Sequence, residues 1–169
     1  LLDCAPASAD RAAVVPDDRA GGAAAVRELV AAGHRRIGYV DAEQEPRPIA
    51  SDLRYEGYAQ MLEEAGIVPD PELHVRALSV AAGGREAADR LLDLPADRRP
   101  TAVFCFNDRM AMGAYAAAHH RGLRIPDDLS IVGYLRPVWD AHRRTFSDMV
   151  MGPVCVTPPR KPTPVSGTH

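Results

Sequence analysis

Paired cysteines and long apolar runs are both missing from this sequence. Its three cysteines (Cys4, Cys105 and Cys155) are far apart and form no CxxC pair, which argues against a disulfide framework or a cysteine-based zinc site. Unpaired cysteines in odd number are typical of a reducing compartment. No apolar run approaches the roughly 20 residues that cross a bilayer, and no basic-then-apolar leader opens the chain. We therefore expect a cytoplasmic protein without membrane contact.

A strong net charge and a catalytic motif are also missing. The formal charge of −3 creates no global field directed at nucleic acid. Neither phosphate-binding glycine loops nor GxSxG or HExxH occur, and the adjacent His119 and His120 point about 100° apart on a helix, so they do not chelate one ion. We expect no cofactor and no enzyme. The less favoured enzymatic alternative rests on Asp17 and Asp18, which follow a strand as in phospho-acceptor domains, but no lysine is placed to partner them.

What the sequence does contain is a regular alternation of strand and helix patterns. Apolar runs at 12–15, 36–40, 73–78, 102–106 and 130–134 predict strands. Residues 16–18 are typical of a helix start, and the helical spacing after them predicts a helix that ends at Gly33. The same spacing predicts helices over 53–66, 84–94 and 110–122, and three of the four helices end at a glycine. This alternation predicts an α/β fold, a doubly wound parallel sheet with helices on both faces.

The clearest single stretch is residues 101–114. A strand over 102–106 has almost nothing polar on either face, as expected for a central parallel strand. Asn107 and Asp108 end it, and a helical pattern begins at Met110. Open α/β sheets bind ligands at such strand–helix corners, so Asn107 is a candidate site residue. The alternative is that Asn107 or Asp108 only caps the helix.

Four segments in this order and spacing resemble one family, the lactose/galactose-repressor (LacI/GalR) type of bacterial transcription regulator. They are GHRRIGY (33–39), RYEGY (54–58), PTAVFCFNDRMA (100–111) and GLRIPDDLSIVGY (122–134). The resemblance implies a periplasmic-binding-protein-like fold, in which two α/β lobes hold a small effector, often a sugar or nucleobase. It also implies a separate helix-turn-helix headpiece that binds DNA.

The resemblance divides the chain into three parts. Residues 1–11 resemble a remnant of the N-terminal lobe and the crossover, and 12–134 resemble the C-terminal effector-binding lobe. Residues 135–169 do not match, and from Pro153 onward they contain five prolines without an apolar stripe, so we expect an irregular or disordered tail. The headpiece and most of the first lobe are expected to lie outside this chain.

Three residues match effector-binding positions of the family. Arg54 matches an arginine that clamps effector hydroxyls or carboxylates, Asn107 an amide at a strand end, and Asp3 a carboxylate of the opposite lobe. Two alternatives stay open from the residues alone: Arg54 as a solvated helix residue paired with Asp52 or Glu56, and Asp3 as a loop cap.

Two departures weaken the pocket that the resemblance implies. The family usually has an aspartate where this chain has Leu135, and Arg136 brings the opposite charge. Ser79 stands near a position where many members have an aromatic. A frameshifted or truncated reading frame would explain the abrupt change at Leu135. With one lobe and an incomplete pocket, we expect no sugar or nucleobase to bind tighter than about millimolar.

The family also implies a homodimer. The helix over 110–120 is the expected contact, with a small-residue face (Ala111, Ala114 and Ala118) and apolar area from Met110, Met112 and Tyr115. The main rival interpretation of the whole chain is a non-functional or interaction-only α/β fragment.

Overall fold

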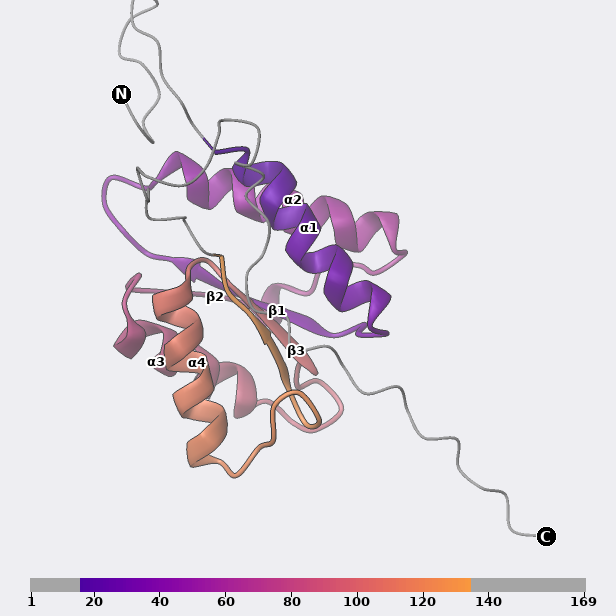
Figure 1. Cartoon of the computed structure of the whole chain (residues 1–169), viewed down its shortest axis with the longest axis vertical. Coiled ribbons are helices and arrows are strands. Elements are labelled where there is room, and N and C mark those ends of the chain that lie inside the picture. The colour runs from indigo at the N-terminus through magenta and orange to yellow at the C-terminus, as the bar shows by residue number, and fades with distance from the viewer. Residues whose placement is uncertain (1–15, 135–169) are drawn as a thin grey trace, which may run out of the picture.

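Strand and helix alternate along residues 16–134, the part of the chain that the computed structural model describes (Figure 1). The strands are β1 (Ile37–Ala42), β2 (His74–Ala77), β3 (Ala102–Cys105) and β4 (Ser130–Val132). The helices are α1 (Asp18–Ala31), α2 (Ile49–Glu64), α3 (Ala81–Leu92) and α4 (Asp108–His120), with a 3₁₀ turn η1 (Pro71–Leu73) before β2.

The four strands form one parallel sheet in the order β2-β1-β3-β4. Tyr39 of β1 is in register with Phe104 of β3, which is in register with Val132 of β4. Figure 1 shows α1 and α2 on one face of the sheet and α3 and α4 on the other. The predicted doubly wound parallel α/β fold is confirmed.

The strands are apolar on both sides because each face of the sheet has its own core. In β3, Val103 and Cys105 lie in the core under α3 and α4, whereas Ala102 and Phe104 lie in the core under α1 and α2. All four side chains are fully buried. A strand covered by helices on both faces needs no polar positions, which is why this run was recognisable in the sequence.

Glycines allow the helices of each layer to approach closely. A Cβ on Gly57 of α2 would overlap the carbonyl oxygen of Arg19 in α1, and a Cβ on Gly113 of α4 would overlap that of Ala81 in α3. Three other glycines, Gly33, Gly66 and Gly122, have positive φ values just after helices, where a left-handed residue ends the helix.

Several predicted boundaries differ from the observed ones, and two of the differences have identifiable reasons. We expected the strand that begins at Arg36 to end at Val40, but β1 continues to Ala42 because Asp41 and Ala42 still pair with β2. Helix α4 begins at Asp108, two residues before the predicted Met110, because Asn107 caps it. Polar residues at strand and helix ends obscure boundaries in a sequence pattern.

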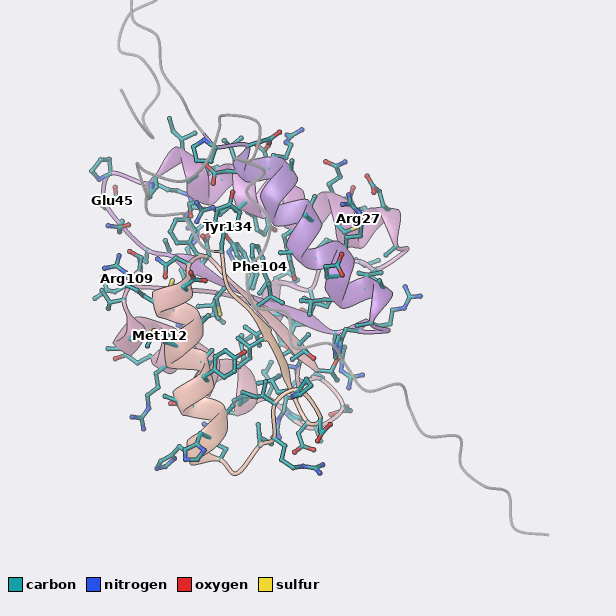
Figure 2. The ribbon with its side chains drawn as sticks, viewed as in Figure 1. Arg27, Glu45, Phe104, Arg109, Met112 and Tyr134 are labelled. Carbon is teal, nitrogen blue, oxygen red and sulfur yellow. The ribbon has the colours of Figure 1, made fainter. Side chains whose placement is uncertain are left out.

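The small-residue face of α4, the helix expected at a dimer contact, packs against the core of this same chain. Met110, Ala111, Ala114 and Ala118 are buried and belong to the core beneath α3 and α4. The expectation that these four residues face a partner was therefore wrong. Met112 remains exposed on α4, with 68% of its surface accessible (Figure 2).

Several predictions fall outside the described residues. They concern the strand at 12–15, the site residue Asp3, and the tail from Leu135 onward. Between residues 16 and 134, no helix combines the length and apolar character needed to cross a membrane.

Candidate functional site

The connections that follow the two central strands, β1 and β3, lead to opposite faces of the sheet. After β1 the chain continues into α2 on one face, and after the neighbouring β3 it continues into α4 on the other face. Such a topological switch point leaves a crevice between the two connections, where open α/β sheets bind their ligands. The candidate site lies here.

Arg54 reaches this point from α2, and its side chain is almost completely buried, with 2% exposed. Its Nε donates to Asp18 Oδ1 at 2.8 Å, and its Nη2 lies 2.7 Å from the same oxygen. Its Nη1 donates to the carbonyl oxygen of Phe106 at 2.5 Å. Arg54 therefore joins α1, α2 and the end of β3. The alternative in which Arg54 is solvated and pairs with Asp52 or Glu56 is wrong.

Two aromatic rings enclose the Arg54 guanidinium. Its central carbon lies 3.7 Å from the ring centroid of Tyr134 and 4.4 Å from that of Phe106. Stacking of this kind stabilises a desolvated cation and fixes its plane. Burial, followed by the charge of Asp18, raises the pKa of Tyr134 to about 12, so its hydroxyl is protonated at neutral pH.

Two tyrosine hydroxyls near this site are buried without a hydrogen-bond partner among residues 16–134. They belong to Tyr134 and to Tyr39 of β1. The Tyr39 ring stacks on those of Phe104 at 5.0 Å and Tyr58 at 5.3 Å between centroids. Each hydroxyl nevertheless lies close enough to a carboxylate, Asp41 for Tyr39 and Asp18 for Tyr134, for that carboxylate to add to the effect of burial in raising its pKa.

Asn107 caps α4, as the alternative interpretation proposed. Its side-chain oxygen accepts a hydrogen bond from the backbone N–H of Met110 at 2.9 Å. Its side-chain nitrogen lies 3.5 Å from the carbonyl oxygen of Ser79, at the limit of a hydrogen bond. The side chain is half-buried, so capping leaves most of the donor capacity of the amide unused.

Asp41 is the residue of this region that the sequence analysis missed. Its buried carboxylate accepts hydrogen bonds from the backbone of Ala42 at 2.8 Å, from Ser51, from Arg47 at 2.9 Å and from His74 at 3.1 Å. Burial opposes ionisation, but the hydrogen bonds from His74, Ser51 and Arg47 outweigh it and hold the pKa of Asp41 at about 2. A carboxylate at a strand end, followed by an arginine six residues later, was the only signal in the sequence.

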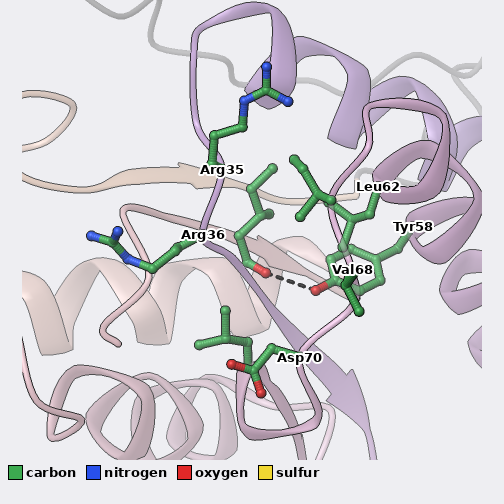
Figure 3. A pocket seen from close by; sticks show the side chains of 9 residues that line it. Arg35, Arg36, Tyr58, Leu62, Val68 and Asp70 are labelled. Atoms are coloured by element: carbon green, nitrogen blue, oxygen red, sulfur yellow. Dashed lines mark hydrogen bonds between the residues drawn. The ribbon is translucent and has the colours of Figure 1, made fainter. Parts of the chain in front are cut away.

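The surface of the described residues has hollows at both edges of the sheet. One of about 400 Å³ lies at the carboxyl ends of β1 and β2 and is lined by Glu43, Gln44, Glu45 and Leu78. The other, of about 150 Å³, lies at the opposite edge of the sheet and is shown in Figure 3, where Tyr58 donates to the carbonyl of Ile37. Neither is lined by Arg54 or Asn107.

The Asp17–Asp18 pair has structural roles. Asp17 caps α1 by accepting from Ala20 N at 2.9 Å, and Asp18 pairs with Arg54. The single lysine of the sequence, Lys161, lies outside the described residues. Within 16–134, no three His, Cys, Asp or Glu side chains are grouped to hold a metal ion.

Comparisons with known proteins agree on one kind of relative. A family model described as "Periplasmic binding protein-like domain" matches residues 26–153. The HTH-type transcriptional repressor PurR of Mannheimia succiniciproducens is 37% identical over 134 residues, covering 79% of this chain and 39% of the relative. The HTH-type transcriptional repressor CytR of Escherichia coli K12 is 44% identical over 110 residues, covering 65% and 31%. The chain thus spans about a third of the length of these curated relatives.

The solved structures that resemble this chain are also of LacI-family regulators. A regulatory protein of LacI family from Chloroflexus aggregans matches with a TM-score of 0.70 and 37% identity, over 76% of this chain and 45% of that one. A LacI family transcriptional regulator from Enterococcus faecium with bound ribose matches with a TM-score of 0.70 and 32% identity, over 79% and 48%.

Proposed function

Because this chain belongs to the periplasmic binding protein-like domain family, in the form carried by LacI-family regulators, we propose that it senses a small molecule for a bacterial transcription regulator. The observation that carries the proposal is the switch point between β1 and β3, to which Arg54 and Asn107 both extend. Because the curated relatives are repressors, they favour sensing over catalysis.

Arg54 and Asn107 are the proposed effector contacts on this lobe. Arg54 uses three of its five N–H groups within the fold, and the proposal assigns the other two to a ligand, which must displace part of the cover that leaves only 2% of this side chain exposed. Asn107, which follows the Phe106 carbonyl that Arg54 contacts, offers amide donors, and the ring of Tyr134 lies against the guanidinium. Asp3 is the proposed contact from the opposite lobe. A sugar or nucleobase suits this set of donors, and the relative with bound ribose supports a sugar.

The remaining parts of the proposal concern the complete regulator. DNA binding is proposed to reside in a helix-turn-helix headpiece outside these 169 residues, and no cofactor is required for effector binding. The regulator is proposed to act in the cytoplasm, where its DNA is, and to form a homodimer.

Calorimetry tests this proposal on the 169-residue chain, with D-ribose and adenine as probes. We expect dissociation constants no tighter than about 1 mM, because one lobe makes few of the contacts needed to offset the cost of association. Asn107→Asp keeps the helix cap but removes the amide donors, and it should weaken binding further. Failure of both probes to bind at any concentration would favour the interaction-only interpretation.

A further inference from the structure

Three groups in contact with the guanidinium of Arg54 belong to the cover that leaves 2% of this side chain exposed. The Asp18 carboxylate and the Phe106 carbonyl accept its hydrogen bonds, and the ring centroid of Tyr134 lies 3.7 Å from its central carbon. A ligand that is to reach the remaining N–H groups of the guanidinium therefore has to displace at least one of these three groups.

The three groups differ in how firmly the fold holds them. Asp18 is the first residue of helix α1. The backbone N–H of Phe106 donates to the carbonyl oxygen of Val40 at 2.8 Å, which fixes Phe106 on the sheet. The pairing of β4 with β3, in contrast, ends at Val132, two residues before Tyr134. Tyr134 is therefore the least constrained of the three.

The ring of Tyr134 also lies against Gly21 of α1. A Cβ on Gly21 would lie 2.4 Å from Cε2 and 2.6 Å from the hydroxyl oxygen of this ring. Because both atoms are at the far end of a side chain that rotates about its χ angles, an added methyl group would push the ring and not the backbone. The neighbouring Gly22 differs, since its Cβ would meet the backbone carbonyl oxygen of Arg54 at 2.6 Å. Gly21 is thus the position from which one methyl group displaces the ring.

We propose that the ring of Tyr134 is a movable cover on Arg54, and that a ligand reaches the guanidinium after this ring has turned away from it. The inference rests on the proposed function, because it states how the effector gains access to one of its proposed contacts. The apparent affinity of such a site is that of the open form, reduced by the fraction of molecules in which the ring is displaced. A substitution that destabilises the closed position of the ring therefore strengthens binding, whereas loss of an ordinary ligand contact weakens it.

The reaction of arginine side chains with phenylglyoxal, followed by mass spectrometry of the 169-residue chain, tests whether Arg54 is covered in this way. Gly21→Ala and Tyr134→Ala should each raise the modification rate of Arg54 about tenfold, as expected when overpacking or loss of the ring disfavours the closed position. The exposed Arg27 of α1 is the internal standard and should react equally fast in all the proteins. Gly113→Ala is the matched control, because it overpacks the helices on the opposite face of the sheet and should leave the Arg54 rate unchanged. If one of the two test variants does not fold, as judged by circular dichroism, the other decides.

Calorimetry with D-ribose is run in parallel. Gly21→Ala should bind ribose about tenfold more tightly than the wild type, since the same shift toward the open form governs both measurements, and Gly113→Ala should match the wild type. An Arg54 rate in Gly21→Ala equal to that of the wild type or of Gly113→Ala would overturn the proposal, and so would equal ribose affinity in Gly21→Ala and the wild type. Faster modification of Arg54 without ribose binding in any of the proteins would support the cover and overturn the proposed function.

Discussion

At the scale of single residues, the site depends on a buried ion pair that no sequence pattern revealed. Arg54 was identifiable from the RYEGY segment, but its partner Asp18 lies 36 positions earlier on another helix. A pairing across that distance depends on how α1 and α2 pack, which local periodicity does not specify. The same holds for Asp41, whose partners come from a loop, a helix and a neighbouring strand.

The first prediction concerns that ion pair. Arg54→Ala should lower the free energy of unfolding by about 3–5 kcal/mol, because it leaves the buried Asp18 carboxylate without its counter-ion. The exposed pair of Arg19 and Glu56 is the control, and Arg19→Ala should cost at most about 1 kcal/mol. Urea unfolding followed by circular dichroism measures both. Similar losses in the two variants would mean that Arg54 is not held as described.

The second prediction concerns pH. His34 bridges Thr101 at 2.9 Å and Ser130 at 3.0 Å, and burial lowers its pKa below 6.5. The folded chain therefore binds a proton at His34 less readily than the unfolded chain does. The stability that His34 contributes should be complete above pH 6.5 and should be lost as the pH falls through its folded pKa.

Thermal unfolding of the wild type and of His34→Gln between pH 5 and 8 provides the comparison. The difference in stability between the two proteins should shrink as the pH falls below 6.5. The exposed His119 and His120 are present in both proteins, so their contributions cancel in the difference in stability. A difference that stays constant across this range would show that His34 does not titrate as its surroundings require.

At the scale of elements, the strand–helix order could be predicted because both faces of the sheet are covered and the strands are therefore apolar throughout. Which helix faces pack together could not be predicted. The alanine face of α4 looked suited to a partner protein, yet it packs under α3, and Gly113 permits that approach. Small residues allow close packing without specifying the neighbour.

The third prediction tests this packing. In an exposed helix, Gly→Ala stabilises by roughly 1 kcal/mol. Gly57→Ala and Gly113→Ala should instead each destabilise by about 1–3 kcal/mol, since the added Cβ meets backbone of the facing helix. Chemical denaturation shows directly whether each substitution raises or lowers the free energy of unfolding. Stabilisation by either substitution would refute the close approach of that helix pair.

At the scale of the whole molecule, residues 16–134 form one parallel α/β layer structure whose candidate site lies at the carboxyl edge of the sheet. The fold class could be reached from four sequence segments, whereas the charge around the candidate site could not. It depends on which basic groups are neutralised by buried acids, and only the folded arrangement of Asp41, Arg47 and His74 shows that.

The fourth prediction concerns association. If α4 contributes to a homodimer, the contact must involve its exposed side, where Met112 is 68% accessible. Met112→Glu should shift a dimer toward monomer in sedimentation at micromolar concentration, with no change in the monomer's circular dichroism. Met110→Leu, a buried volume-conserving change, is the control and should leave association unaltered. A wild-type chain that is monomeric at these concentrations would remove α4 as a contact for this chain.

The most direct test of the account is where a ligand binds on the 169-residue chain. An NMR titration with D-ribose and adenine should move the backbone amides of Gln44, Ser79 and Asn107, at the carboxyl edge of the sheet, with millimolar affinity. The amides of Arg36, Val68 and Asp70, which surround the hollow at the opposite edge, should stay in place. Shifts confined to that opposite edge, and unaffected by Asn107→Asp, would contradict the assignment of the site to the divergence of β1 and β3.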